Sequence, residues 1–340
     1  MKKIFLLLLV FSMVGILPIA CSKEDPKIIN EPITVSLSLS GEICVEHEAL
    51  TKVSSADLYG INVYYDKDKD GTIDNEYGYG LFDDISKMTI TLISGYKYRF
   101  ECILIKDGKN KLDNTNGIEY KEPFEKKLEN KFILGDGVMP KINCGVAHMP
   151  GNYHASDFPE LDRYYGETTN YEPIQNGVID IYLKRCSFGV KYIITGLVDG
   201  SLTTDIKCFQ PKYYNSDYIT LCRETNSADI ESDVKIYSFY DIRECWASED
   251  LYIRGGRVEA KYDSNRGDLW DIDNSLNLVV YGDNVQFKRN ILTVIYINVS
   301  PDLSSATMQF SLEEMTDENT IDIGINGNGL LENIIKPNEE

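Results

Sequence analysis

The chain has 340 residues, of which 54 are acidic and 34 are basic, and its formal net charge is −20. This length is enough for two hydrophobic cores of ordinary domain size, and one large β domain is also allowed. The strong excess of acids, without a basic stripe, argues against binding to nucleic acid and against a polybasic contact with a membrane surface.

The N-terminus has the layout of a secretory signal peptide. Two lysines precede an uncharged, mostly apolar run over residues 4–20, which is a basic start followed by an apolar core. Cys21 directly follows the small Ala20. This arrangement resembles the lipobox of bacterial lipoproteins, whose cysteine is acylated and becomes the first residue of the mature chain, although Pro18 stands where a leucine is usual.

The four residues after Cys21 are Ser-Lys-Glu-Asp, which resemble the short signal that sends Bacteroidetes lipoproteins to the outer face of the outer membrane. The resemblance implies a signal peptide over residues 1–20, acylation at Cys21 and a lipidated tether over residues 21–31. The protein is then expected at the cell outer membrane, surface-exposed and lipid-anchored, since two or more acyl chains hold a protein stably. An ordinary signal peptide with an incidental cysteine is the alternative.

Strand patterns begin directly after the tether. Residues 33–40 alternate apolar side chains with Thr and Ser, which is the period of a strand with one wet face. Further strands are predicted at residues 61–65, 88–92 and 96–104. Short alternating segments separated by turn residues predict an antiparallel all-β domain, to which we assign residues 32–176.

A second β domain is predicted over residues 177–340. It opens with alternating segments at residues 179–184 and 188–194, and strand patterns return beyond residue 278. Residues 225–275 contain many acids, Ser and Asn and have no assignment. Helices and strands do not alternate along the chain, so a parallel sheet is not expected.

Seven cysteines lie beyond Cys21. An exported protein can form disulfides, and an odd number leaves at least one cysteine unpaired if all pairs are internal. The sequence has no CxxC motif, so neither a zinc ribbon nor a redox pair is indicated. The pairing of the cysteines stays open, and most of them are equally well explained as small buried hydrophobic residues.

Several segments together resemble the fimbrillin superfamily of Bacteroidales, whose members build or anchor type V pili. They read LYGINVYYDKDKDG, YGYGLFDDISKMTITLISGYKYRFE, YYGET and GVIDIYLKRCSFGVKYIITG. The resemblance implies two tandem transthyretin-like antiparallel β-sandwich domains and a pilus subunit, or anchor-like surface lipoprotein, with other pilin-like subunits as partners.

Members of that family polymerise by strand donation, after a protease removes the first strand of a stalk subunit. In such subunits the cut typically follows an arginine after that strand. Here the first arginine after Cys21 is Arg99, which lies well inside the domain, although Lys52 leaves a lysine route open. This favours a subunit that keeps its lipid and its first strand. The alternative is that arginine was simply not used in this loop.

An acidic segment resembles a calcium-binding loop. Its oxygen-bearing residues at every second position, with Gly71 at the sixth, follow the EF-hand pattern. They are Asp66, Asp68, Asp70, Thr72 and Asp74. Position 12 of this pattern is Tyr77, where a bidentate Glu is expected, and the residues on either side of the loop have strand patterns. We therefore expect a hairpin loop that binds calcium weakly, or a solvated acidic turn.

Catalysis is not expected. The sequence contains no GxSxG, HExxH or phosphate-binding glycine loop, and its three histidines are His47, His148 and His154. A metal held by His148, His154 and Asp157 would have a spacing that fits no common site. A catalytic triad or a carboxylate pair cannot be read from the sequence, because such partners meet only in space.

The function that these features favour is a surface lipoprotein that serves as a pilus anchor, tip or accessory subunit through strand complementation. The alternative is a surface glycan-binding lipoprotein of a nutrient-uptake system. Tyrosine pairs at residues 164–165 and 213–214 could form such a glycan-binding surface, although tyrosine on strands more often packs with its hydroxyl at the water edge.

The lipid anchor gives a first prediction. A Cys21→Ala variant should lose all incorporation of radiolabelled palmitate, because the acylated atom is removed, and the protein should leave the membrane fraction. Cys44→Ala is the matched control and should label as the unchanged protein does. Equal labelling of the Cys21→Ala variant would contradict the assignment.

Overall fold

The computed structural model describes residues 31–42, 56–135, 142–144, 161–198, 200–208, 219–227, 229–239, 242–248, 256–263 and 279–315. Their regular structure is almost entirely strand, which confirms the predicted all-β class. The helices among them are η1 (Ile85–Lys87), α2 (Gly108–Lys111) and α3 (Ile242–Ala247). No helix in this part of the chain is both long and apolar enough to cross a membrane.

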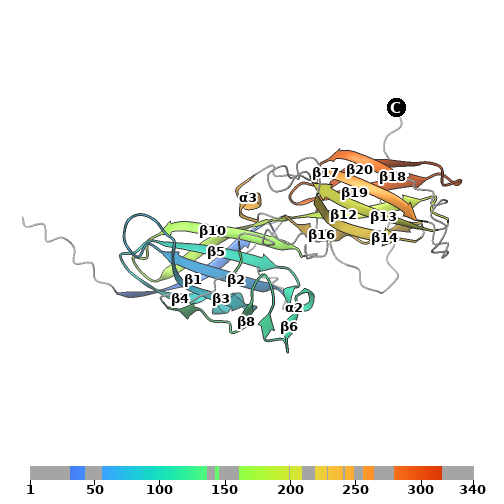
Figure 1. Ribbon diagram of the computed structural model, residues 1–340. Helices are drawn as coiled ribbons and strands as arrows, with labels where there is room; N and C mark the ends of the chain where they lie inside the picture. Colours follow the sequence, from blue (N-terminus) through green and yellow to red (C-terminus); the bar gives the residue numbers. More distant parts are fainter. Residues whose placement is uncertain are drawn as a thin grey trace, which may run out of the picture.

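Figure 1 shows two lobes, with β1 to β10 in one and β12 to β20 in the other. The first lobe contains an eight-stranded sheet in the order β4-β1-β11-β10-β5-β2-β3-β9. Its strands are β1 (Pro32–Gly41), β2 (Leu58–Tyr65), β3 (Asn75–Phe82), β4 (Thr89–Ile93), β5 (Tyr98–Ile105), β9 (Ile133–Leu134), β10 (Arg163–Tyr171) and β11 (Gly177–Arg185). A small sheet beside it comprises β6 (Asn114–Thr115), β7 (Glu119–Tyr120) and β8 (Lys126–Lys127).

The eight-stranded sheet is folded back on itself around one core. Residues of β1, β4 and β11 share a single hydrophobic cluster with residues of β2, β3 and β5, so the two halves of the sheet form the layers of a sandwich. The halves meet at a corner, where β10 and β11 pair through only two residue pairs, Tyr164 with Arg185 and Tyr165 with Lys184. The next residue on β10 is Gly166, and a Cβ atom at that position would lie 2.3 Å from the carbonyl oxygen of Tyr182.

Strand β11 lies in the first sheet. The predicted boundary at residue 177 would place this strand at the start of a second domain, but β11 pairs with β1 and β10 instead. Its buried Ile179, Ile181 and Leu183 belong to the same core as β1. The chain therefore passes to the second lobe at Cys186, one residue after β11 ends.

The second lobe holds two further sheets. One has the order β15-β12-β19-β20, with β16 also paired to β12, and the other has the order β14-β13-β17-β18. The strands are β12 (Ser187–Thr195), β13 (Ser201–Cys208), β14 (Ile219–Asn226), β15 (Ile230–Glu231), β16 (Lys235–Ser238), β17 (Gly256–Asp263), β18 (Val279–Val285), β19 (Ile291–Val299) and β20 (Ala306–Glu314). Apolar residues of β12, β13, β17 and β19 pack together in one cluster between these sheets.

Among the described strands, each lobe contains one parallel pair, contrary to the expectation of purely antiparallel sheets. Strand β1 runs parallel to β11, and β12 runs parallel to β19. In both cases the first strand of the lobe pairs with a strand far along the chain, so the connection passes through many intervening residues. Short-range alternation predicts strands but does not predict their distant partners.

Strands β2 and β5 are buried on both faces. All eight residues of β2 are buried. Tyr59, Ile61 and Val63 face the core of the sandwich, whereas Leu58 belongs to the cluster that continues into the second lobe. The two lobes are thus joined through apolar packing as well as through the chain.

The corner at Gly166 gives a second prediction. A Gly166→Ala variant should lose about 1–3 kcal/mol of unfolding free energy in urea titrations, because its methyl group overlaps a backbone carbonyl that cannot move aside without strain. Gly177→Ala is the matched control, since its nearest atom would lie 3.9 Å away. Equal stability of the two variants would contradict the described corner.

Candidate functional site: the groove that holds the first strand

The first strand occupies an interior position in its sheet. Strand β1 pairs in parallel with β11 from Val35 to Gly41, and it pairs antiparallel with β4 from Pro32 to Ser36. The amide of Leu37 also donates to the carbonyl of Met88 at 2.8 Å. Strand β4 therefore pairs with one edge of β1 as far as Leu37, and β11 pairs with the other edge from Val35 onward.

One face of β1 enters the core. Its Ile33, Val35, Leu37 and Leu39 are 7%, 0%, 4% and 3% exposed and pack in the cluster that fills the first lobe. The opposite face carries Thr and Ser and is half-buried or exposed. The predicted alternation over residues 33–40 is confirmed.

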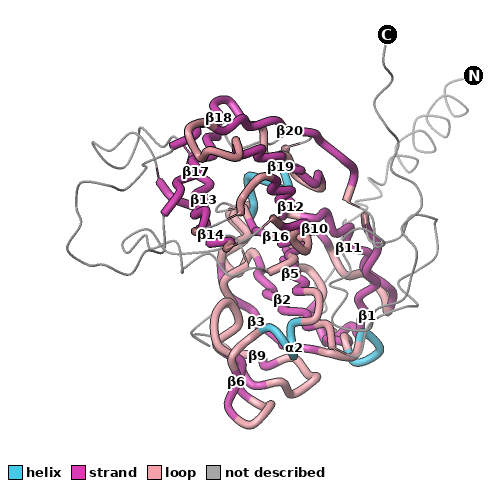
Figure 2. The backbone as a smooth tube through the Cα atoms, turned by 90° about the vertical axis from the view of Figure 1, so that its right-hand side faces the viewer, coloured by secondary structure: helices cyan, strands magenta, loops and turns pink. Residues whose placement is uncertain are grey.

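Neither neighbour of β1 is joined to it by a hairpin. Strand β4 begins at Thr89 and β11 begins at Gly177, and both pair with β1. Figure 2 shows β11 beside β1. If β1 left the sheet, β4 and β11 would each expose an unpaired edge, and the core would open along an apolar trough. Such a groove can bind an extended segment of matching alternation, through main-chain hydrogen bonds and side-chain pockets.

The end of β1 is bound to the second lobe. Arg289 Nη1, just before β19, donates to both carboxylate oxygens of Glu42 at 2.7 and 2.6 Å. The backbone amide of Arg185 donates to the same carboxylate at 2.9 Å. Most of this ion pair is shielded from water, with side-chain exposures of 10% for Arg289 and 21% for Glu42. The position of the first strand and the placement of the second lobe are thus coupled.

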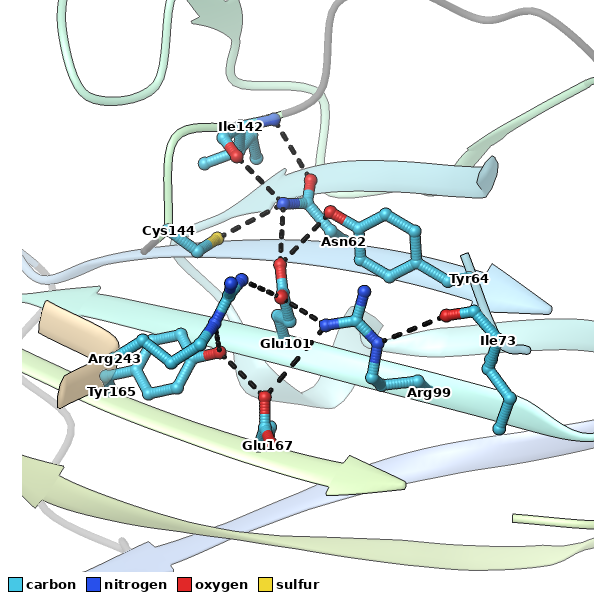
Figure 3. A network of polar contacts seen from close by, with 10 residues as sticks. All are labelled: Asn62, Tyr64, Ile73, Arg99, Glu101, Ile142, Cys144, Tyr165, Glu167 and Arg243. Atoms are coloured by element: carbon cyan, nitrogen blue, oxygen red, sulfur yellow. Dashed lines mark hydrogen bonds and ion pairs between the residues drawn. The ribbon is translucent and has the colours of Figure 1, made fainter. Parts of the chain in front are cut away.

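A second polar connection between the lobes surrounds Glu101 on β5 (Figure 3). Its carboxylate accepts from Arg99 on the same strand and from Arg243 on α3. Tyr64 Oη donates to it at 3.1 Å and Asn62 Nδ2 at 3.4 Å. Glu101 is 1% exposed, so these donors take the place of water around a buried charge.

The network extends to the neighbouring strand β10. Glu167 lies directly opposite Glu101 in the strand register, and Arg99 approaches its carboxylate at 4.0 Å. Tyr165 Oη donates to Glu167 at 3.0 Å and accepts from Arg243 at 3.4 Å. Two like charges opposite one another are destabilising when alone. Here Arg99 and Arg243 lie among them, so the arrangement binds the lobes together.

The ion pairs set the protonation state of Glu101. Burial raises its pKa, but the charges of Arg99 and Arg243, with hydrogen bonds from Arg99 and Asn62, lower it further than burial raises it. The net effect is a pKa below the ordinary value. Glu101 therefore remains a carboxylate at neutral pH and is a structural anion rather than a proton donor.

The acidic loop after β2 forms a hydrogen-bonded turn. The Asp66 carboxylate accepts from the amides of Asp70 and Gly71, both at 3.1 Å, and Asp70 Oδ1 accepts from the amide of Thr72 at 2.7 Å. Among the described residues, no group of three or more acidic, histidine or cysteine side chains could hold a metal ion. These bonds fit the simple hairpin turn, and calcium binding by Asp66, Asp68, Asp70, Thr72 and Asp74 stays a prediction.

Several other predicted residues fall outside the described part of the chain. These are Cys21, Lys52, His148, His154, Asp157 and the tyrosine pair at 213–214. The other tyrosine pair is in the core, since Tyr164 is 3% and Tyr165 0% exposed, so it cannot form an exposed binding platform. Arg99, considered above as a cleavage point, is within β5 and bound to Glu101.

The residues that join the lobes were not found from the sequence. A glutamate within the apolar strand Tyr98–Ile105 is a usable signal, because a buried carboxylate requires a partner. That partner, Arg243, comes from the segment that has no assignment from pattern alone. Nothing in the sequence around Glu42 or Arg289 indicates that they pair, because each stands near the end of a strand, as ordinary charged loop residues do.

No family model matches the chain, and no curated protein is significantly similar to it. Solved structures do align with it. They include the tip fimbrial protein Mfa3 from Porphyromonas gingivalis with a C-terminal truncation (7% identity, 84% of this chain and 100% of that one, TM-score 0.36). A fimbrial assembly protein from Parabacteroides distasonis aligns at 12% identity over 84% of this chain and 95% of that one, with a TM-score of 0.32.

A third alignment is with a Bacteroides thetaiotaomicron protein that is provisionally described as polysaccharide-binding (11% identity, 84% of this chain and 99% of that one, TM-score 0.42). Similarity at these scores does not by itself assign a function, so the proposal below depends on the chain's own geometry.

The buried network gives a third prediction, on pH. Since the folded pKa of Glu101 is lowered, its contribution to stability is complete above the ordinary value of 4.5 and is lost as the pH falls through the lower folded value. A Glu101→Gln variant should be about 1–3 kcal/mol less stable at neutral pH, because hydrogen bonds to a buried charge are lost while Arg243, whose side chain is 52% exposed, stays hydrated. It should also lose less stability than the unchanged protein on acidification.

Urea titrations at a series of pH values measure both effects. Glu167→Gln is the matched control, because that side chain is 18% exposed and its ion pair should contribute about 1 kcal/mol or less. If Glu101→Gln and the unchanged protein lost stability in parallel between neutral pH and pH 3 (about 1.5 units below the ordinary carboxyl pKa), the assigned role would be wrong.

Proposed function

We propose that this protein is a surface-exposed, lipid-tethered subunit of a pilus, acting as an anchor, tip or accessory subunit through β-strand complementation. The observation that carries the proposal is the place of β1. The first described strand of the chain is inserted between β4 and β11, with its apolar face in the core and with no hairpin to either neighbour. A strand held in this way can be exchanged for another. The groove that it occupies fits any extended segment with the same alternation of apolar and polar side chains.

The groove has enough binding energy for a stable joint. Burial of a Val, Leu or Ile side chain contributes about 1.5–3 kcal/mol, so the four buried side chains of β1 contribute on the order of 6–12 kcal/mol as an upper estimate. Main-chain bonds along both edges add about 0.5–1.5 kcal/mol each. A strand from another subunit with the same alternation would gain from the same contacts.

The structure supports retention of the first strand in this subunit. Arg99 lies inside β5, in the middle of the sheet, so a cut there would not release β1 alone. The ion pair between Glu42 and Arg289 adds a tie to the second lobe. If the chain were cut after Lys52, β1 could leave only after the Glu42–Arg289 ion pair and the pairing of β1 in the sheet had both been broken.

The proposed tether is the acylated Cys21 followed by residues 22–31. Acyl chains contribute about 0.8 kcal/mol per buried CH₂, and two chains give stable anchoring. Such an anchor would hold the β lobes outside the outer membrane, where other pilin-like subunits are the partners. The action proposed is binding and not catalysis.

Glycan binding is less well supported by the described surface. Large exposed aromatic side chains are the usual platform for sugar rings. Among the described residues the exposed tyrosines include Tyr182 on β11 and Tyr281 on β18. These strands belong to different sheets in different lobes, so the two rings do not form a common platform.

Strand exchange gives a fourth prediction. A specific protease site is inserted within residues 43–55, the purified protein is cut, and a labelled peptide of residues 31–42 is added in excess. The cut protein should take up the peptide in place of its own strand, as followed by fluorescence anisotropy and native mass spectrometry. The uncut protein should not exchange.

The control peptide carries Val35→Asp and Leu37→Asp. It should bind at least about 100-fold more weakly, because two buried apolar contacts are lost and two charges would enter the core. Uptake of both peptides to the same extent, or of neither peptide by a cut protein that remains folded, would contradict the proposed groove.

A further inference from the structure

Two buried cysteines meet where the lobes join. Cys186 is the single residue between β11 and β12, and Cys245 lies on α3. Both are fully buried, and both are thiols in the structure. They are 59 positions apart in the sequence, so only the fold brings them together.

The contacts of Cys186 place its sulfur against α3. Its Sγ lies 3.6 Å from the carbonyl oxygen of Ile242, which is three residues before Cys245 on the same helix. In a helix the carbonyl oxygen of Ile242 points toward the turn that contains Cys245, and the Cys245 thiol is close enough to Cys186 for that neighbour to raise its pKa.

The backbone at Cys186 is fixed on both sides. Its amide donates to the carbonyl of Arg163 at 2.7 Å, and its carbonyl accepts from the amide of Phe239 at 3.1 Å. The strand crossover therefore holds one sulfur in place while α3 presents the other. Two cysteines whose backbones are held next to one another in this way require little movement to be joined.

We propose that Cys186 and Cys245 are joined by a disulfide bond in the exported protein. The proposal takes from the proposed function only the export of the chain to an oxidising compartment. The co-reactant is a thiol–disulfide oxidoreductase in its oxidised form. One cysteine thiolate attacks the disulfide of that enzyme to give a mixed disulfide, and the second thiolate displaces the enzyme. The chain loses two protons and two electrons, and the enzyme leaves as a dithiol.

The folded protein itself resists this reaction. Burial raises the pKa of the Cys245 thiol, and the neighbouring Cys186 raises it further, so thiolate is scarce once α3 is packed. The bond should therefore form while the chain folds and should then be protected from reductants. It would close a loop from the β11–β12 crossover to α3, the helix whose Arg243 pairs with Glu101.

The full-length acylated protein, extracted from membranes in denaturant with an alkylating reagent present, tests the bond. Peptide mapping without reduction should recover a linked pair of peptides that contain Cys186 and Cys245. The linked pair should be missing from Cys186→Ser and from Cys245→Ser. It should persist in Cys102→Ser, the matched control, because Cys102 is buried in the other core.

A second readout uses heat. When reduced under denaturing conditions, alkylated and refolded, the unchanged protein should melt about 5–15 °C lower than its oxidised form. The Cys186→Ser, Cys245→Ser double variant should show no such difference. Recovery of both cysteines as alkylated thiols from palmitate-labelled protein would overturn the disulfide while leaving the lipid anchor intact. Absence of palmitate would overturn the anchor instead.

Discussion

The structure depends on the burial of the apolar face of β1 between β4 and β11. Its four buried side chains close one side of the core of the first lobe, and its two edges satisfy the backbone groups of strands that lie far away in sequence. Without β1, the sandwich would have an open trough and two unpaired edges. The same geometry that stabilises the fold therefore creates a site for strand recognition.

The lobes are connected by charge at two separate points. Glu42 at the end of β1 binds Arg289 of the second lobe, and Glu101 of the first lobe binds Arg243 of α3. The Glu42–Arg289 pair is mostly shielded from water, whereas in the second pair Glu101 is buried and the Arg243 side chain is 52% exposed. Such pairs add little net stability compared with apolar contacts, but removing the partner of a buried carboxylate is costly because that charge is left unpaired. They fix the relative position of the lobes, and the first of them makes that position sensitive to the presence of the first strand.

Much of the strand content could be predicted, because alternation is a local property of the sequence. The alternation over residues 33–40 predicts strand β1, and β19 lies among the strand patterns predicted beyond residue 278. The place of β11 was not found, since its pattern suits either lobe and its parallel partner lies more than 130 residues away. The ion pair of Glu101 with Arg243 was also missed, because only the packing of α3 against β10 brings the arginine close. Strand β17 lies in a region whose polar composition hides its pairing with β13 and β18.

Native-state hydrogen exchange on the intact protein tests the central claim most directly. If β1 is an integral interior strand, the amide of Leu37, which donates to Met88, should be strongly protected and should exchange only when β1 leaves its groove or the protein unfolds. The amides of β4 and β11 that face β1 should show the same protection. Rapid exchange along β1 while β5 stays protected would show that the first strand is a peripheral addition, and the account of the groove would be wrong.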